Sequence, residues 1–132
     1  MSVESDIQKA LLDACEAMPD VWAMRCNAGT IRHHGRTIVL APDGTADIIG
    51  CMSTRTAYTV ANVAGPVKLI IPGSAFFGLE VKDPDGRTSK KRAAKQLEWR
   101  EMIRALGGFA ARVESVDEGL AALDRARRGE SE

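Results

Sequence analysis

Apolar residues between positions 3 and 18 recur with the period of a helix. Their spacings of four, four, three and four residues place them on one side of it: Val3, Ile7, Leu11, Ala14 and Met18. Ser2 stands just before this stripe, where it can accept a hydrogen bond from the first free backbone N–H groups. The sequence therefore predicts an amphipathic helix that ends before Pro19-Asp20.

The middle of the chain is apolar and rich in β-branched residues, which is typical of strands. The predicted strands are VWAMRCN (21–27), TIVLAP (37–42), ADIIGCM (46–52), AYTVANV (57–63), VKLIIP (67–72) and AFFGLEVK (75–82). We expect residues 28–36 to form a loop. Turn residues predict one hairpin around Asp43-Gly44, joining 37–42 to 46–52, and a second one around 64–66.

The last third of the chain returns to helical periodicity. A helix is predicted from Ser89 to Leu106, because Gly107-Gly108 interrupts the pattern there. The strand FAARVES (109–115) follows, and Ser115 with Glu118 forms a capping box that begins a terminal helix. We expect an α/β fold, a mixed β-sheet flanked by helices, in which the crossover 82–109 joins parallel neighbours.

Composition limits the class of protein. The 132 residues, 45% hydrophobic and 27% charged, suit one domain spanning 1–132, with a flexible tail at about 128–132. No apolar run approaches the roughly 20 residues that span a bilayer, and the acidic N-terminus is unlike a secretory signal. We therefore expect a cytoplasmic protein with no membrane partner. Its three cysteines, an odd number, favour buried thiols over a disulfide framework.

Positive charge is concentrated although the net charge is zero. Between positions 87 and 104 there are seven cations and two carboxylates, a difference of five: Arg87, Lys90, Lys91, Arg92, Lys95, Arg100 and Arg104 against Glu98 and Glu101. A second basic group lies nearer the start: Arg25, Arg32, His33, His34 and Arg36. Such local charge is compatible with contacts to an acidic polymer, and equally with a solvated surface.

The strand at 75–82 carries two charges on one face. Side chains alternate along a strand, so Glu80 and Lys82 point to the same side while Leu79 and Val81 point to the other. Burying either charge alone is costly, so the pair needs mutual neutralisation or a polar ligand. An ordinary ion pair at the end of a sheet remains one interpretation.

Asp47 is a second carboxylate in an apolar, strand-like run. It could simply be a turn residue that bonds to local backbone. If it instead approaches Glu80, the two carboxylates repel unless a cation lies between them. Hard oxygen ligands suit Mg²⁺ or Mn²⁺, and the lack of a Cys/His pattern argues against zinc.

The order of these residues resembles a known family. Asp47 followed by Glu80-Val81-Lys82 is similar to the D…E-x-K motif of the PD-(D/E)xK nuclease superfamily. The landmarks resemble its virus-type replication-repair nuclease (VRR-NUC) family over about residues 4–120: Gly44 to Ile48, Glu80 to Lys82, Asp85-Gly86-Arg87, Gln96 with Trp99, and Gly107-Gly108. The segment 51–74 is longer and more apolar than that family's usual link.

The resemblance implies a restriction-endonuclease-like fold with an αβββαβα-type core and a metal-dependent DNA endonuclease. Asp47 and Glu80 would bind Mg²⁺ or Mn²⁺, with the Val81 carbonyl and Glu4 as further ligands. Lys82 would serve the attacking water, and Gln96 would project from its helix toward the site. The resemblance also implies a homodimer that acts on branched DNA, such as four-way (Holliday) junctions, in DNA repair or replication in a bacterial or phage-infected cell.

The basic residues would hold the phosphate backbone without reading sequence. The expected DNA contacts are Lys90, Lys91, Arg92, Lys95, Arg25, Arg32 and Arg36. The paired histidines fit a polar loop better than a metal site, and Trp99 fits core packing better than base stacking. Two other functions stay open: a flap- or end-processing nuclease, and a non-catalytic DNA-binding module on the same fold.

Overall fold

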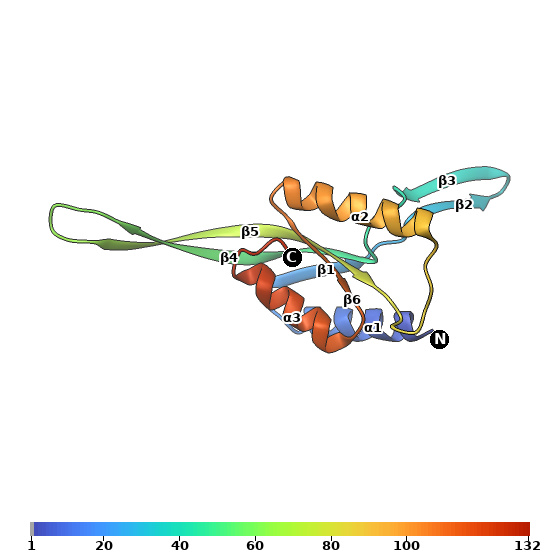
Figure 1. Ribbon diagram of the computed structural model, residues 1–132, viewed down its shortest axis with the longest axis horizontal. Coiled ribbons are helices and arrows are strands. Elements are labelled where there is room, and N and C mark those ends of the chain that lie inside the picture. Colours follow the sequence, from blue (N-terminus) through green and yellow to red (C-terminus); the bar gives the residue numbers. More distant parts are fainter. Residues whose placement is uncertain (1) are drawn as a thin grey trace.

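The computed structural model describes residues 2–132 (Figure 1). The elements are α1 (Val3–Glu16), β1 (Val21–Arg25), β2 (Gly29–His33), β3 (Arg36–Ala41), β4 (Ile48–Val60), β5 (Val67–Val81), α2 (Lys90–Ala105), β6 (Phe109–Val113) and α3 (Val116–Arg127). The predicted caps Ser2 and Ser115 are confirmed, because their hydroxyls accept backbone hydrogen bonds at the starts of α1 and α3, and Ser89 caps α2 in the same way.

Four strands form a mixed sheet in the order β1-β4-β5-β6. β1, β4 and β5 are antiparallel neighbours, whereas β6 is parallel to β5. The crossover through α2 makes this parallel pairing possible, as the sequence predicts. The coarse prediction of a mixed α/β sheet flanked by helices is therefore confirmed.

Helices cover both faces of this sheet. α1 and α3 lie on one face and α2 lies on the other (Figure 1). The core sits on the first side, where alternate residues of β4 and β5 meet Leu11 of α1 and Leu123 of α3: Ile48, Met52, Phe77, Leu79 and Val81. The opposite face, under α2, carries Glu80.

The predicted hairpin between 37–42 and 46–52 is wrong, and so is the loop predicted at 28–36. β3 turns back on β2 instead, in a separate two-stranded sheet. His34 and Gly35 make this turn with positive φ angles of 50° and 74°, a conformation that suits a two-residue hairpin. β4 pairs with β1 and β5 instead, because this position buries the face of β4 that carries Ile48 and Met52.

The second predicted hairpin, around 64–66, is confirmed and is longer than expected. β4 and β5 stay paired from Ile48 with Leu79 out to Val60 with Val67. The outer half of this ribbon projects far beyond the rest of the molecule (Figure 1).

Trp99 holds α2 against the sheet at one glycine. A Cβ atom on Gly78 would lie 2.4 Å from Cη2 of Trp99, so only glycine leaves room for the ring. The ring also meets Phe76 edge to face, with centroids 6.3 Å apart. Trp99 is half-buried, and this packing agrees with its predicted role.

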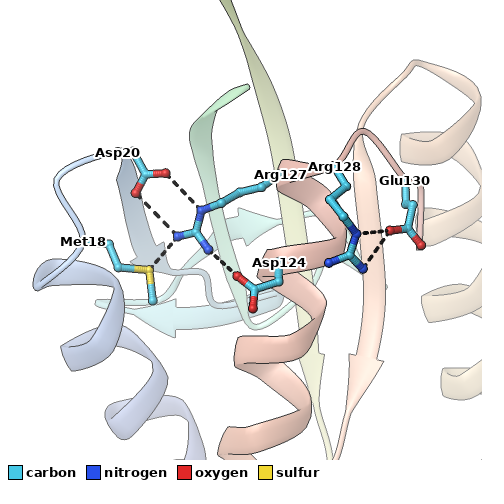
Figure 2. Close-up of polar contacts among 6 residues, drawn as sticks. All are labelled: Met18, Asp20, Asp124, Arg127, Arg128 and Glu130. Carbon is cyan, nitrogen blue, oxygen red and sulfur yellow. Dashed lines mark hydrogen bonds and ion pairs between the residues drawn. The ribbon is translucent and has the colours of Figure 1, made fainter. Parts of the chain in front are cut away.

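Arg127 ties the end of α3 to the turn after α1 (Figure 2). Its guanidinium donates to Asp20 Oδ2 at 3.0 Å and to Asp124 Oδ1 at 2.7 Å, and it also contacts Met18 Sδ. The next residue, Arg128, pairs only with Glu130 in Figure 2. The following tail lies against β6, since the Ala110 N–H donates to the Ser131 carbonyl at 3.1 Å.

Only part of the thiol prediction holds. Cys15 is buried, but Cys26 is half-buried and Cys51 is exposed. Cys51 is exposed because it lies on the face of β4 away from Ile48 and Met52. None of the helices within residues 2–132 is both long and apolar enough to span a membrane.

Candidate functional site

Asp47 and Glu80 meet on the face of the sheet beneath α2. Asp47 stands immediately before β4, and its Oδ2 accepts a hydrogen bond of 2.8 Å from the Val81 N–H, 34 residues further along the chain. Its side chain thus continues the pairing of β4 with β5 beyond Ile48 and Leu79. The structure thereby brings together the two carboxylates that the sequence singles out.

Glu80 is buried among polar partners, with 1% of its surface exposed. Its Oε1 accepts a hydrogen bond of 2.7 Å from Gln96 Nε2 and lies 3.1 Å from Lys82 Nζ. Its Oε2 is also buried and finds no hydrogen-bond partner among residues 2–132. A buried carboxylate oxygen in this condition is costly, which marks the place where a ligand would be stabilising.

Burial and the neighbouring carboxylate govern the ionisation of this pair. Loss of hydration, reinforced by the charge of Asp47, raises the pKa of Glu80 to about 7, against the opposing effect of Lys82. Burial also raises the pKa of Asp47, although its bond from the Val81 N–H and the charge of Lys82 oppose the rise. The site therefore holds excess negative charge that a proton or a metal cation would relieve.

A cleft of about 550 Å³ opens above the two carboxylates. Its lining joins the β3–β4 loop and the segment after β1 to the N-terminal half of α2: Cys26, Asn27, Ala28, Asp43, Gly44, Thr45, Asp47, Glu80, Ser89, Lys91, Arg92, Lys95 and Gln96. Carboxylates thus stand at the sheet and cations on the helix that borders the cleft. One of these cations, Lys95, is paired with Asp43 at 3.1 Å, and both side chains are largely exposed.

Gln96 is the point at which α2 reaches the site. The predicted inward direction is observed, since its side chain is 5% exposed and bonds to Glu80. The packing of Trp99 on Gly78 holds the next turn of the same helix close to the same strand. A buried polar side chain needs a hydrogen-bond partner, and for Gln96 this partner is Glu80.

Lys82 forms with Glu80 the ion pair that the sequence left open as one interpretation. Lys82 is 5% exposed and its ammonium is paired with Glu80, and the residue lines a second hollow, of about 420 Å³, on the other side of Gln96. Arg100 and Arg112 line the same hollow. Lys82 therefore neutralises Glu80 from the side of the second hollow, whereas the two carboxylates are reached from the cleft on the other side.

Arg100 and Arg112 are site neighbours that sequence reasoning missed. Partial burial lowers the pKa of the Arg100 guanidinium, whereas the nearby charge of Glu80 opposes this shift. The available signal was spacing, since Arg100 is one helical turn after Gln96 and therefore shares its face of α2. Arg112 is opposite Glu80 in the register of β5 and β6, which the sequence could not reveal.

The donor atoms suit a hard divalent cation. Glu80 Oε2 and the Asp47 carboxylate are oxygen donors at one place, as Mg²⁺ and Mn²⁺ prefer. Within residues 2–132 no group of three or more histidine, cysteine, aspartate or glutamate side chains is arranged to hold a metal. An ion bound here would have two carboxylate ligands and would complete its coordination with water or substrate, which is usual for Mg²⁺.

Glu4 lies near this site, but its carboxylate already accepts a hydrogen bond from the backbone. Its Oε1 accepts a hydrogen bond of 3.2 Å from the Asp83 N–H, just after β5. Its charge also contributes to the raised pKa of Asp47. The predicted Glu4 and Val81 carbonyl ligands remain predictions.

The other predicted DNA contacts are exposed and lie at two places. Lys91, Arg92 and Lys95 line the cleft, whereas Lys90 is exposed outside it. Arg25 ends β1, and Arg32 and Arg36 flank the turn of the β2–β3 hairpin, outside the lining of the cleft. The two histidines lie at that same turn, His33 next to His34.

Comparison of this chain with family models, with curated proteins and with solved structures gave no match in any of the three.

Proposed function

We propose that this chain is a metal-dependent DNA endonuclease of the VRR-NUC type, with the restriction-endonuclease-like fold. The observation that carries the proposal is the buried Glu80 carboxylate, which faces Asp47 and keeps one oxygen without a hydrogen-bond partner among the described residues. The element order supports it as well. Without the β2–β3 hairpin, the chain follows the expected αβββαβα order.

The proposed chemistry assigns a separate task to each side chain. Asp47 and Glu80 would hold Mg²⁺ or Mn²⁺, which supplies Lewis acidity toward a phosphoryl oxygen and lowers the pKa of a bound water. Gln96 fixes the orientation of the Glu80 carboxylate through its 2.7 Å bond. Lys91, Arg92 and Lys95 border the cleft, where they would neutralise the phosphates on either side of the reacting one.

Lys82 supports the reaction through charge in this proposal. Its ammonium lies 3.1 Å from Glu80 Oε1 and favours the ionised form of that carboxylate, which metal binding requires. Serving the attacking water, as the family resemblance implies, would require the ammonium to turn from Glu80 toward the cleft. The two tasks differ in their consequences: the first predicts weaker metal binding in Lys82→Ala, and the second predicts slow cleavage with metal bound normally.

Cleavage assays test the proposal directly. Purified protein is incubated with end-labelled four-way junction, flap, duplex and single-stranded DNA in Mg²⁺, Mn²⁺ or chelator. We expect metal-dependent cleavage that falls by about 10²–10⁴-fold in Asp47→Asn and Lys82→Ala. Asp43→Asn is the matched control, because this exposed carboxylate borders the same cleft and pairs only with Lys95 among the described contacts.

The substrate panel also decides between branched DNA and a simpler substrate. A strong preference for the four-way junction supports the branched-DNA expectation, whereas preference for the flap supports end processing. Cleavage that is unchanged in Asp47→Asn would contradict the proposed site.

A non-catalytic DNA-binding module is the second candidate. It is favoured by one observation, the burial of Lys82 against Glu80 on the far side of the cleft. Calorimetry with Mn²⁺ distinguishes the two. The nuclease requires heat of binding and a gain in stability that disappear in Asp47→Asn, whereas the binding module predicts neither.

A further inference from the structure

β6 is an edge strand of the four-stranded sheet, so one of its sides has no neighbouring strand. Ala110 uses that side: its N–H donates to the Ser131 carbonyl at 3.1 Å, and its carbonyl accepts from the Arg104 guanidinium at 2.8 Å. Backbone groups alternate in direction along a strand, so Arg112 presents its N–H and C=O to the same side. Within residues 2–132 the backbone of the tail bonds to β6 only at Ala110, so the edge stays open at Arg112.

Two hollows lie along this edge. The second hollow, of about 420 Å³, and another of about 510 Å³ share Leu97, Arg100 and Arg112 in their linings. We call the two together the arginine groove, and its walls come mainly from α2, β6 and α3. Five cations line it: Lys82, Arg100, Arg104, Arg112 and Arg125.

The positive charge of the arginine groove is only partly neutralised. Three of its cations are paired with carboxylates: Lys82 with Glu80, Arg104 with Glu132 and Arg112 with Glu114. Arg100 has no carboxylate partner of this kind within residues 2–132. Partial burial, together with the charges of Arg104 and Arg112, lowers the pKa of Arg100 against the opposing charge of Glu80. A further anion in the groove would relieve this repulsion and pair with a partly buried guanidinium.

The tail of the chain shows which chemistry the groove accepts. Residues 130–132 read Glu-Ser-Glu. The Glu132 carboxylate lies 3.2 Å from Arg104, and the main-chain oxygen of the same residue accepts a hydrogen bond of 3.2 Å from Arg125 Nε. An acidic peptide segment is thus held by guanidinium groups and by one backbone bond to the strand edge. The Glu132 side chain is 69% exposed, so its ion pair is weak and can be replaced.

The groove suits a peptide better than a strand of nucleic acid. Phosphates could pair with its guanidinium groups, but a phosphodiester backbone has no N–H for the open carbonyl of Arg112, whereas a peptide adds to a sheet edge through both N–H and C=O. Sites for single-stranded nucleic acid also present aromatic side chains on which bases stack. Among residues 2–132 no aromatic side chain lines either hollow, and apolar Ala93 and Leu97 stand between the cations instead.

We propose that the arginine groove and the open edge of β6 bind an extended acidic segment of a partner protein, which adds to the sheet beside β6 and displaces the tail. Arg100 and Arg104 are one helical turn apart, about 6 Å along the axis, and alternate residues of a strand are about 6.6 Å apart. Carboxylates at every second residue of the added strand therefore match the two guanidinium groups. The cleft lies on the other side of Gln96, so this inference stands or falls apart from the proposed nuclease.

Fluorescence anisotropy of the full chain with labelled peptides tests the groove. The probe is ESESESES, QSQSQSQS is its uncharged control, and EEEESSSS has the same composition without the alternation. We expect saturable binding of ESESESES, weaker binding of EEEESSSS and none of QSQSQSQS. Unlabelled oligothymidylate and inorganic phosphate, added as competitors, should not displace the peptide at equal concentration of negative charge.

Two matched double variants locate the site. Arg100→Gln with Arg112→Gln should weaken binding of ESESESES by about tenfold or more, since it removes two charge-assisted contacts. Arg55→Gln with Lys68→Gln removes two exposed cations from the outer half of the β4–β5 ribbon and should leave the affinity unchanged. Glu132→Gln weakens the competing tail, so it should raise the affinity by about two- to fivefold. Circular dichroism checks that each variant retains its fold.

Four outcomes would overturn the inference. The acidic and uncharged peptides could bind alike, ESESESES and EEEESSSS could bind alike, both double variants could lose affinity equally, or Glu132→Gln could leave the affinity unchanged. Displacement of the peptide by oligothymidylate, together with loss of oligothymidylate binding in the Arg100 and Arg112 double variant, would instead identify the groove as a nucleic-acid contact.

Discussion

Gln96 and Glu80 are joined by a buried hydrogen bond of 2.7 Å although they belong to different elements, helix α2 and strand β5. Both side chains are at least nine-tenths buried, at 5% and 1% exposure. The bond fixes one carboxylate oxygen and leaves the other directed to a place where the described residues supply no hydrogen-bond partner. It therefore links the position of α2 to the chemistry of the site.

Removing this bond should destabilise the protein when Glu80 is charged. In Gln96→Leu the buried Oε1 keeps only Lys82 as partner, so we expect the free energy of unfolding at pH 8 to fall by about 1–3 kcal/mol. Urea unfolding in the presence of chelator measures it. Glu98→Ala, on the exposed side of the same turn, should change stability by less than about 0.5 kcal/mol. Equal effects of the two substitutions would contradict the structural importance of the bond.

Glu80 should make the metal-free protein less stable as pH rises. The folded state holds the Glu80 proton up to a pKa of about 7, compared with 4.5 for the ordinary group. Between these pH values the folded state binds more protons than the unfolded state. The stabilisation that the Glu80 proton contributes to folding is therefore complete below about pH 4.5 and is lost as the pH rises to about 7. The expected loss is about 3 kcal/mol.

Unfolding of the unmodified chain and of Glu80→Gln, at pH 5 and pH 8 with chelator, measures this dependence. Glu80→Gln should lose less stability across the range, since the amide does not ionise. Asp47 also has a raised pKa, so some dependence of the same sign should persist in the variant. Parallel pH curves for the two proteins would show that Glu80 does not titrate in this window.

The cations beside the cleft should account for part of the salt dependence of DNA binding. Replacing both Lys91 and Arg92 by alanine should lower the slope of log K against log salt by about 2, at roughly 0.9 per phosphate contact. Fluorescence anisotropy with labelled duplex, in an Asp47→Asn background, provides the measurement. Lys9→Ala, on α1 at an exposed site paired with Asp13, is the control and should leave the slope unchanged. An unchanged slope in the double variant would place the DNA elsewhere.

Arg127 should contribute to stability and Arg128 should not. Arg127→Ala removes the contacts to Asp20, Asp124 and Met18 in a partly exposed setting, so we expect a loss of about 1–2 kcal/mol after allowance for solvent screening. The adjacent Arg128→Ala removes one exposed pair with Glu130 and should cost less than about 0.5 kcal/mol. Thermal unfolding of the two variants compares them. Similar melting temperatures would mean that the Arg127 cluster adds no net stability.

Local patterns sufficed where the deciding interactions are short in range. The three helices and their serine caps depend on contacts between residues three or four positions apart, which can be read along the chain. The distribution of charge can also be read along the chain, and so can the alternation that puts Glu80 and Lys82 on one face of a strand.

Strand pairing was partly beyond the sequence, because several apolar runs compete for the same neighbours. The Asp43-Gly44 turn suggested a hairpin, yet the His34-Gly35 turn pairs β3 with β2, and β4 gains more burial between β1 and β5. A long continuous ribbon in place of two short strands also follows from this pairing. Turn signals alone do not rank such alternatives, since burial depends on residues far away in the chain.

The sequence by itself determined that an aspartate, a glutamate, a lysine and a glutamine stand at positions compatible with one site, on helices and strands of a mixed α/β fold. Only the tertiary structure decided their arrangement: Asp47 reaches Val81, Gln96 and Lys82 share one oxygen of Glu80, and the cleft opens on the side away from Lys82. The reason is physical. Spacing fixes which face of its own element a side chain occupies, whereas depth, partner and ionisation arise when separate elements exclude water from a common place.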